Sequence, residues 1–142
     1  MVRMRDRRFY VGVKALVTDT GGNILLLRKV PRKPSHRWKP FWDLPGGKMQ
    51  SSSIRSTLLR EVKEELGTGK IRIGRFYGAG VARFRINGGR DGLVLIVYRC
   101  ALRKGTRIRL SEEHDAYEWV RPSEAKRRLS TMFDREFLAG MA

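Results

Sequence analysis

The sequence predicts an α+β fold, in the form of an α/β/α sandwich around a mixed central sheet. Apolar runs typical of strands outnumber the segments with helical spacing, and the two kinds alternate irregularly along the 142 residues. Short glycine-containing turns separate several of the strand-like runs, which favours hairpins over a doubly wound parallel sheet. The length suits one domain that spans residues 1–142.

The first strand is expected at residues 9–19, FYVGVKALVTD, before the turn TGGN and a second apolar run, ILLLRK. Strand-like runs on both sides of a short Gly/Asn turn predict a β-hairpin. Residues 30–41 combine prolines with basic side chains and predict a loop. A short extended piece at residues 42–45 then leads into Gly46 and Gly47, where the backbone can turn or approach a ligand closely.

A helix is predicted at residues 54–66, where apolar residues recur at helical spacing. The serines at positions 51–53 are N-cap candidates, and Gly67 is a C-terminal stop. Five later runs are expected to be strands: IRIGRFYG, VARFRI, LVLIVYRCAL, IRL and AYEWV. The segments PSEAKRRL and TMFDREFL predict two terminal helices, the first of which opens at Pro122.

The chain is strongly basic, with 31 Lys and Arg against 14 Asp and Glu and a formal net charge of +17. This balance favours a polyanionic partner such as a nucleotide or nucleic acid, and a solvated basic surface is the alternative. No apolar run reaches the length of a membrane span, and the N-terminal residues lack the apolar stretch of a signal peptide. We therefore expect a cytoplasmic location without a membrane segment. Cys100 is expected to be a buried core thiol.

Three of the scarce carboxylates, Glu61, Glu64 and Glu65, crowd into five residues of the predicted helix. At about 100° per residue they lie in one sector beside the apolar face. Hard divalent cations such as Mg²⁺ take oxygen ligands, so a metal ion would supply the missing positive charge. A solvated acidic face, with Arg60 and Lys63 as local partners, is the alternative.

The segment LPGGKMQSSSIRSTLLREVKEELG resembles the Nudix box, whose pattern is Gly-x5-Glu-x7-Arg-Glu-U-x-Glu-Glu-x-Gly-U with U aliphatic. The second half matches from Arg60 to Gly67, with Thr68 in place of the last aliphatic residue. The front half is degenerate, because the first glutamate of the pattern is replaced by Ser52. WDLPGGK resembles the segment that leads into the box in MutT-type members, and EHDAYEWV also fits the family, so the resemblance covers most of the chain.

The resemblance implies Mg²⁺- or Mn²⁺-dependent hydrolysis of a pyrophosphate linkage in a nucleoside diphosphate derivative. The favoured expectation is a MutT-like (d)NTP pyrophosphohydrolase. The alternatives are ADP-ribose or dinucleoside polyphosphate hydrolysis, or a nucleotide- or RNA-binding module with weakened catalysis. The replacement at Ser52 predicts weaker metal binding or reduced turnover. Many relatives are monomers or dimers, so either state is expected.

The resemblance also implies roles for individual residues. Arg60 would orient the carboxylates, and the implied metal ligands are Glu61, Glu64, Glu65 and the carbonyl of Gly46. Some family members carry an additional catalytic glutamate before the last strand, where this chain has Glu112 and Glu113; an ordinary acidic turn is the alternative. Lys48 is a candidate phosphate contact or a solvated loop lysine.

Aromatic residues are candidates for stacking on a nucleobase. Trp38 and Phe41 are favoured because they lie in the basic loop, and the other candidates are Trp42, Tyr77 and Phe84. Arg83 or Arg85 is expected near the phosphates. The remaining expectations are core positions for Phe76 and Trp119, a surface or structural role for His114, and a solvent-facing side chain for His36.

Overall fold

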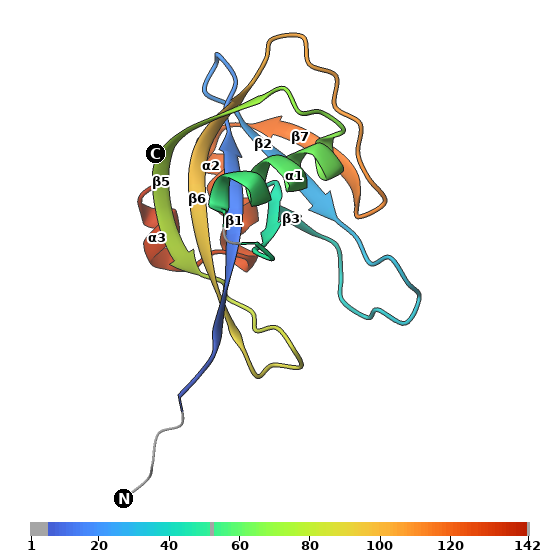
Figure 1. The fold of residues 1–142 in the computed structure, drawn as a ribbon, viewed down its shortest axis with the longest axis vertical. Coiled ribbons are helices and arrows are strands. Elements are labelled where there is room, and N and C mark those ends of the chain that lie inside the picture. Colours follow the sequence, from blue (N-terminus) through green and yellow to red (C-terminus); the bar gives the residue numbers. More distant parts are fainter. Residues whose placement is uncertain (1–5, 52, 142) are drawn as a thin grey trace, which may run out of the picture.

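The computed structural model describes residues 6–51 and 53–141. It contains a four-stranded mixed sheet in the order β4-β1-β6-β5 and a three-stranded antiparallel sheet in the order β3-β2-β7 (Figure 1). The predicted α+β fold with a mixed sheet is confirmed, since β1 and β6 run parallel. The elements are β1 (Phe9–Val17), β2 (Ile24–Lys29), β3 (Phe41–Asp43), β4 (Gly46–Lys48), α1 (Ile54–Leu66), β5 (Ile71–Val81), β6 (Gly92–Leu102), β7 (His114–Val120), α2 (Pro122–Arg128), a 3-10 turn (Leu129–Thr131) and α3 (Arg135–Ala139).

Side chains of β1 and β2 alternate between two apolar cores. Val13 and Leu25 pack with α1, whereas Leu16 and Leu26 pack in a second core with residues of α2 and α3. In Figure 1, α1 crosses the near face of the strands, with α2 and α3 behind them. Because both faces of β1 and β2 are covered, these strands appear in the sequence as continuous apolar runs.

The hairpin predicted between residues 9–19 and ILLLRK is wrong. β1 is hydrogen-bonded to β4 and β6, and β2 to β3 and β7, so the two strands belong to different sheets. An isolated bridge joins Thr18, just after β1, to Ile24. The turn itself forms as expected: the Asp19 carboxylate accepts hydrogen bonds from the backbone N–H groups of Gly21 and Asn23. The turn at Asp19 reverses the chain direction, but it does not determine which strands pair. β1 and β2 are each covered on both faces and pair within separate sheets.

Helix α1 begins and ends where the sequence predicts. The side chain of Ser53 accepts a hydrogen bond from the Ser56 backbone N–H at 3.1 Å and caps the N-terminus. Gly67 ends the helix in a left-handed conformation with φ of 70°. Ser52, which the sequence places at the altered box position, lies outside the described residues.

Other expectations require correction. Residues 108–110 form no strand; Ile108 and Leu110 instead pack from a loop against the core beneath α1. Phe76 and Trp119 are not core residues, with exposed fractions of 58% and 36%, because β5 and β7 are edge strands with an open face. Cys100 is buried as predicted, and burial raises the pKa of its thiol to about 11. Among the described helices, none has the length and apolar character of a membrane span.

Candidate metal and nucleotide site

Glu65 is the most deeply buried of the three carboxylates on α1. Its side chain is 5% exposed, against 16% for Glu61 and 58% for Glu64. One oxygen, Oε1, accepts a hydrogen bond from the Gly46 backbone N–H at 2.7 Å. Burial raises the pKa of Glu65 to about 8, although Lys14 and the Gly46 N–H favour the charged form. The local compensation is therefore incomplete, and a cation would stabilise the ionised carboxylate.

The glycine pair allows α1 to approach β4 closely. Gly46 has φ of 143°, and a Cβ there would lie 2.0 Å from the carbonyl oxygen of Val13. A Cβ at Gly47 would lie 2.5 Å from the carboxyl carbon of Glu61. Only glycine fits at position 46. At Gly47, the lack of a side chain lets the Glu61 carboxylate lie against the backbone.

Arg60 lies beside two of the carboxylates. Its Nη1 atom is 3.4 Å from Glu61 Oε1 and 3.6 Å from Glu64 Oε1. Burial and the neighbouring Glu64 nevertheless raise the pKa of Glu61 above its ordinary value. This geometry is suitable for Arg60 to orient the two carboxylates. It neutralises their negative charge only in part, so a second cation could also bind them.

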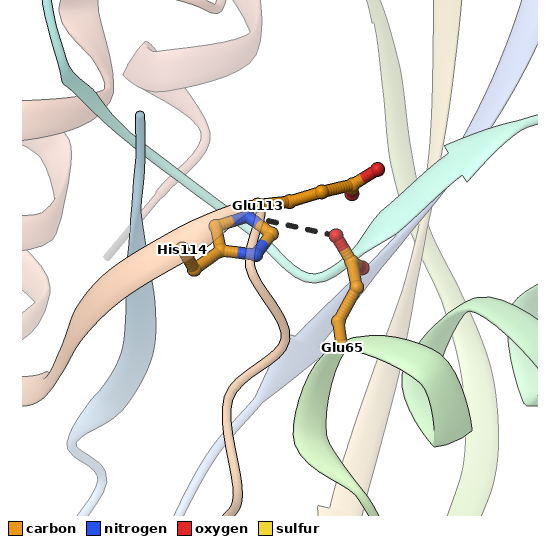
Figure 2. A group of neighbouring side chains, drawn as sticks. All are labelled: Glu65, Glu113 and His114. Atoms are coloured by element: carbon orange, nitrogen blue, oxygen red, sulfur yellow. Dashed lines mark ion pairs between the residues drawn. The ribbon is translucent and has the colours of Figure 1, made fainter. Parts of the chain in front are cut away.

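The last residue of the turn before β7, Glu113, and the first residue of β7, His114, lie close to Glu65. Figure 2 shows Glu65, Glu113 and His114 together, and each has a potential ligand atom within 4.8 Å of the others' ligand atoms. His114 is 5% exposed, so the expected surface position is excluded and a structural position remains. Glu112 lies outside this group: its side chain is 88% exposed and 3.4 Å from Arg32.

A buried ion pair that the sequence analysis missed underlies the site. Lys14 Nζ donates to Asp43 Oδ2 at 2.8 Å, and both side chains are almost fully buried. Burial lowers the pKa of Lys14, but Asp43, Glu65 and Glu61 outweigh this effect and raise it above its ordinary value. A single lysine within the apolar run FYVGVKALV was the available signal, since buried charges need partners.

A cavity of about 650 Å³ opens beside the glycine pair. Its lining joins β1 and β4 to the basic loop and to the segment after β5. The aromatic and basic side chains in the lining are Trp38, Phe41, Phe84, Lys14, Lys29, Lys48 and Arg85. Volume and lining both suit a small ligand that combines an aromatic ring with negative charge.

Comparison with known proteins decides the family. A family model described as NUDIX domain matches residues 8–141. The chain belongs to the Nudix family. A search of curated protein sequences finds no significant match.

Solved structures share the Nudix fold. The MutT protein from Methanosarcina mazei Go1 is 28% identical, with a TM-score of 0.73 and coverage of 96% of this chain and 94% of that one. The ORF135 protein of E. coli is 24% identical, with a TM-score of 0.65 and coverage of 94% and 89%. A C. elegans Ap4A hydrolase is 18% identical, with a TM-score of 0.68 and coverage of 92% and 93%. The last two likenesses show the fold alone.

The Nudix assignment accounts for the position of the box on the fold. Its second half forms the C-terminal turns of α1, and Gly46 and Gly47 are the first two residues of β4. Nudix hydrolases generally depend on a divalent metal, and the donor set here fits one: two carboxylates, Glu61 and Glu65, have raised pKa values because their charge is poorly solvated.

The predicted ligand-contacting residues divide into two groups. Trp38, Phe41 and Lys48 line the cavity, together with Phe84 and Arg85. Arg83 is placed elsewhere, because its Nη1 donates to the carbonyl of Ser130 at 2.9 Å. Tyr77 and Trp42 pack against the second core, and His36 is exposed and stacks near Trp38. Nucleic-acid binding stays a prediction.

Proposed function

We propose that this Nudix protein is a divalent-cation-dependent nucleotide pyrophosphohydrolase that cleaves a (d)NTP in the manner of a MutT-like enzyme. The observation that carries the proposal is that the cavity and the carboxylates of α1 meet at the same two glycines. A cavity with aromatic and basic walls borders Gly46 and Gly47, and the same glycines contact Glu65 and Glu61. A nucleobase and its phosphates would thus bind beside a cation site.

Each group of residues has a distinct part in the proposed reaction. A bound divalent cation would neutralise phosphate charge and make a water molecule more acidic. Glu61, Glu64 and Glu65 would hold the cation together with the Gly46 carbonyl, while Arg60 orients the first two carboxylates. From the β7 side, Glu113 is the preferred additional acid, because it lies in one group with Glu65 and His114, whereas the Glu112 side chain is 88% exposed and outside that group.

Substrate binding is assigned to the cavity walls. Lys48 and Arg85 would contact the phosphates, and Trp38, Phe41 and Phe84 would contact the base. The three aromatic rings form a chain, with centroids 5.5 Å apart from Trp38 to Phe41 and 6.5 Å apart from Phe41 to Phe84. Such a wall provides faces on which a base can stack.

A substrate panel tests the proposal. Canonical and oxidised (d)NTPs, ADP-ribose and a dinucleoside tetraphosphate are incubated with Mg²⁺ or Mn²⁺, and the nucleotide products, ribose 5-phosphate, phosphate and pyrophosphate are separated and quantified. We expect a nucleoside monophosphate and pyrophosphate from at least one (d)NTP. Preferred cleavage of ADP-ribose or of the dinucleotide would favour that alternative instead. No metal-dependent cleavage of any of these compounds would overturn the enzymatic proposal.

Replacing Trp38 with Ala is expected to raise KM for the nucleotide roughly tenfold while changing kcat little. Stacking of a base on an aromatic side chain contributes about 1–3 kcal/mol, and Trp38 lines the cavity, whose lining does not include the three carboxylates of α1. Steady-state kinetics on the best substrate of the panel measure both constants. Trp119→Ala is the matched control, since Trp119 is similarly exposed and does not line this cavity. Equal KM values for the two variants would contradict base stacking on Trp38.

A further inference from the structure

The hydrogen-bonding capacity of His114 is not used within the described part of the chain. Its side chain is 1% exposed. Nδ1 has no hydrogen-bond partner among residues 6–51 and 53–141. Nε2 is 3.5 Å from Glu65 Oε2, beyond the usual 2.7–3.2 Å of an N–H···O hydrogen bond. A buried polar atom without a partner costs about 1–3 kcal/mol, so this ring is placed at an energetic disadvantage unless something else binds it.

The imidazole ring is chemically suited to bind a metal ion. A neutral imidazole has a nitrogen lone pair that can bind a metal ion. Its contact with a carboxylate places two electron-pair donors side by side, an arrangement that a shared cation would stabilise.

The third member of the group completes the set of donors. In Figure 2 the carboxylates of Glu65 and Glu113 lie on the same side of the His114 ring. Ligand atoms of all three residues lie within 4.8 Å of one another. Glu65 comes from α1, whereas Glu113 ends the turn before β7 and His114 begins that strand, so two segments far apart in sequence supply one compact group.

We propose that His114 contributes an imidazole nitrogen to the divalent-cation site that it forms with Glu65 and Glu113, which makes this a mixed nitrogen–oxygen site. The inference rests on the cation dependence proposed above and adds a ligand to it. Mg²⁺ strongly prefers oxygen ligands, whereas imidazole suits first-row transition ions. The site therefore favours ions such as Mn²⁺ and Co²⁺ over Mg²⁺ more than carboxylates alone would.

Electron spin-echo spectroscopy of the Mn²⁺-loaded, tag-free protein tests this directly. A nitrogen bound to Mn²⁺ produces a ¹⁴N modulation, and the sequence contains only two histidines, His36 and His114. We expect this modulation in the wild-type protein and in His36→Asn, and its replacement by ¹⁵N couplings after labelling with ¹⁵N-histidine. The isotope experiment uses the unmodified chain, so its outcome does not depend on whether a His114 variant folds.

Metal affinities provide a second readout. His114→Leu is expected to weaken Co²⁺ binding about tenfold or more, with a much smaller effect on Mg²⁺, because only the transition ion gains substantially from the nitrogen. Isothermal titration calorimetry of both ions with wild type, His114→Leu and the control His36→Leu measures the ratio. An equal loss for the two ions would indicate a packing role and overturn the proposal.

The outcomes separate this inference from the proposed function. Mn²⁺ that binds without any histidine coupling, and is lost in Glu65→Gln, would overturn the role of His114 and leave the carboxylate site intact. Failure of the wild-type protein to bind Mn²⁺, Co²⁺ or Mg²⁺ would overturn both. Histidine coupling together with an altered Co²⁺ to Mg²⁺ ratio supports the nitrogen ligand independently of any substrate.

Discussion

Glu65→Gln is expected to lower the cation-dependent turnover at least about a thousandfold while the protein remains folded. Glutamine retains an oxygen that can accept the hydrogen bond from the Gly46 N–H, but it loses the negative charge of the most buried carboxylate. A thousandfold loss corresponds to about 4 kcal/mol of transition-state stabilisation, within the range of metal-ion catalysis. Comparison of kcat/KM with that of wild type, at saturating Mg²⁺ and Mn²⁺, measures the effect.

The same substitution is expected to stabilise the metal-free protein at high pH. The pKa of Glu65 is raised from 4.5 to about 8, so between these values the folded state binds a proton that the unfolded state has released. Wild-type stability must therefore fall as pH rises through this window. Glutamine has no proton to lose, so the variant should exceed wild type by on the order of a few kcal/mol above about pH 8 and approach it below about pH 5.

Thermal unfolding in EDTA at the two pH extremes checks this dependence. Glu136→Gln is the matched control, because Glu136 is an exposed carboxylate on α3, outside the group of acids on α1. The control should change neither turnover nor the pH profile. A Glu65→Gln variant with wild-type turnover would contradict the metal assignment, and one that is no more stable than wild type above about pH 8 would contradict the buried, uncompensated carboxylate.

Features that depend on local interactions were predictable from the sequence. The limits of α1 follow from apolar spacing, the Ser53 cap and Gly67, all within one continuous segment. The common side of Glu61, Glu64 and Glu65 follows from the same helical spacing. The resemblance to the Nudix box added Gly46 to the expected site residues. These predictions need no knowledge of the rest of the chain.

Features that depend on distant partners were not predictable in the same way. The pairing of β1 with β6 joins residues about eighty positions apart, and no local signal distinguishes it from a hairpin with β2. The ion pair between Lys14 and Asp43 also joins two strands that are distant in the sequence, so no local signal predicts this pairing. Glu112 and Glu113 are neighbours with the same chemistry, and only the course of the chain into β7 brings one of them to Glu65.

Gly46→Ala is expected to destabilise the protein by about 3 kcal/mol or more. A φ of 143° is disfavoured for a residue with a side chain, and the new methyl group would lie 2.0 Å from the carbonyl oxygen of Val13. Val13 cannot yield easily, because β1 is an inner strand hydrogen-bonded to both β4 and β6. Urea-induced unfolding of the metal-free protein measures the loss.

Gly22→Ala isolates the contribution of the steric contact. Gly22 also has a positive φ, 81°, but a methyl group there would meet nothing within 4 Å. Its substitution should cost only about 1–2 kcal/mol, the usual penalty for a side chain in the left-handed region. The remainder of the Gly46 effect then reports the packing of β4 against β1, which fixes the N–H group that orients Glu65. Similar losses in the two variants would show that backbone conformation alone requires glycine at position 46.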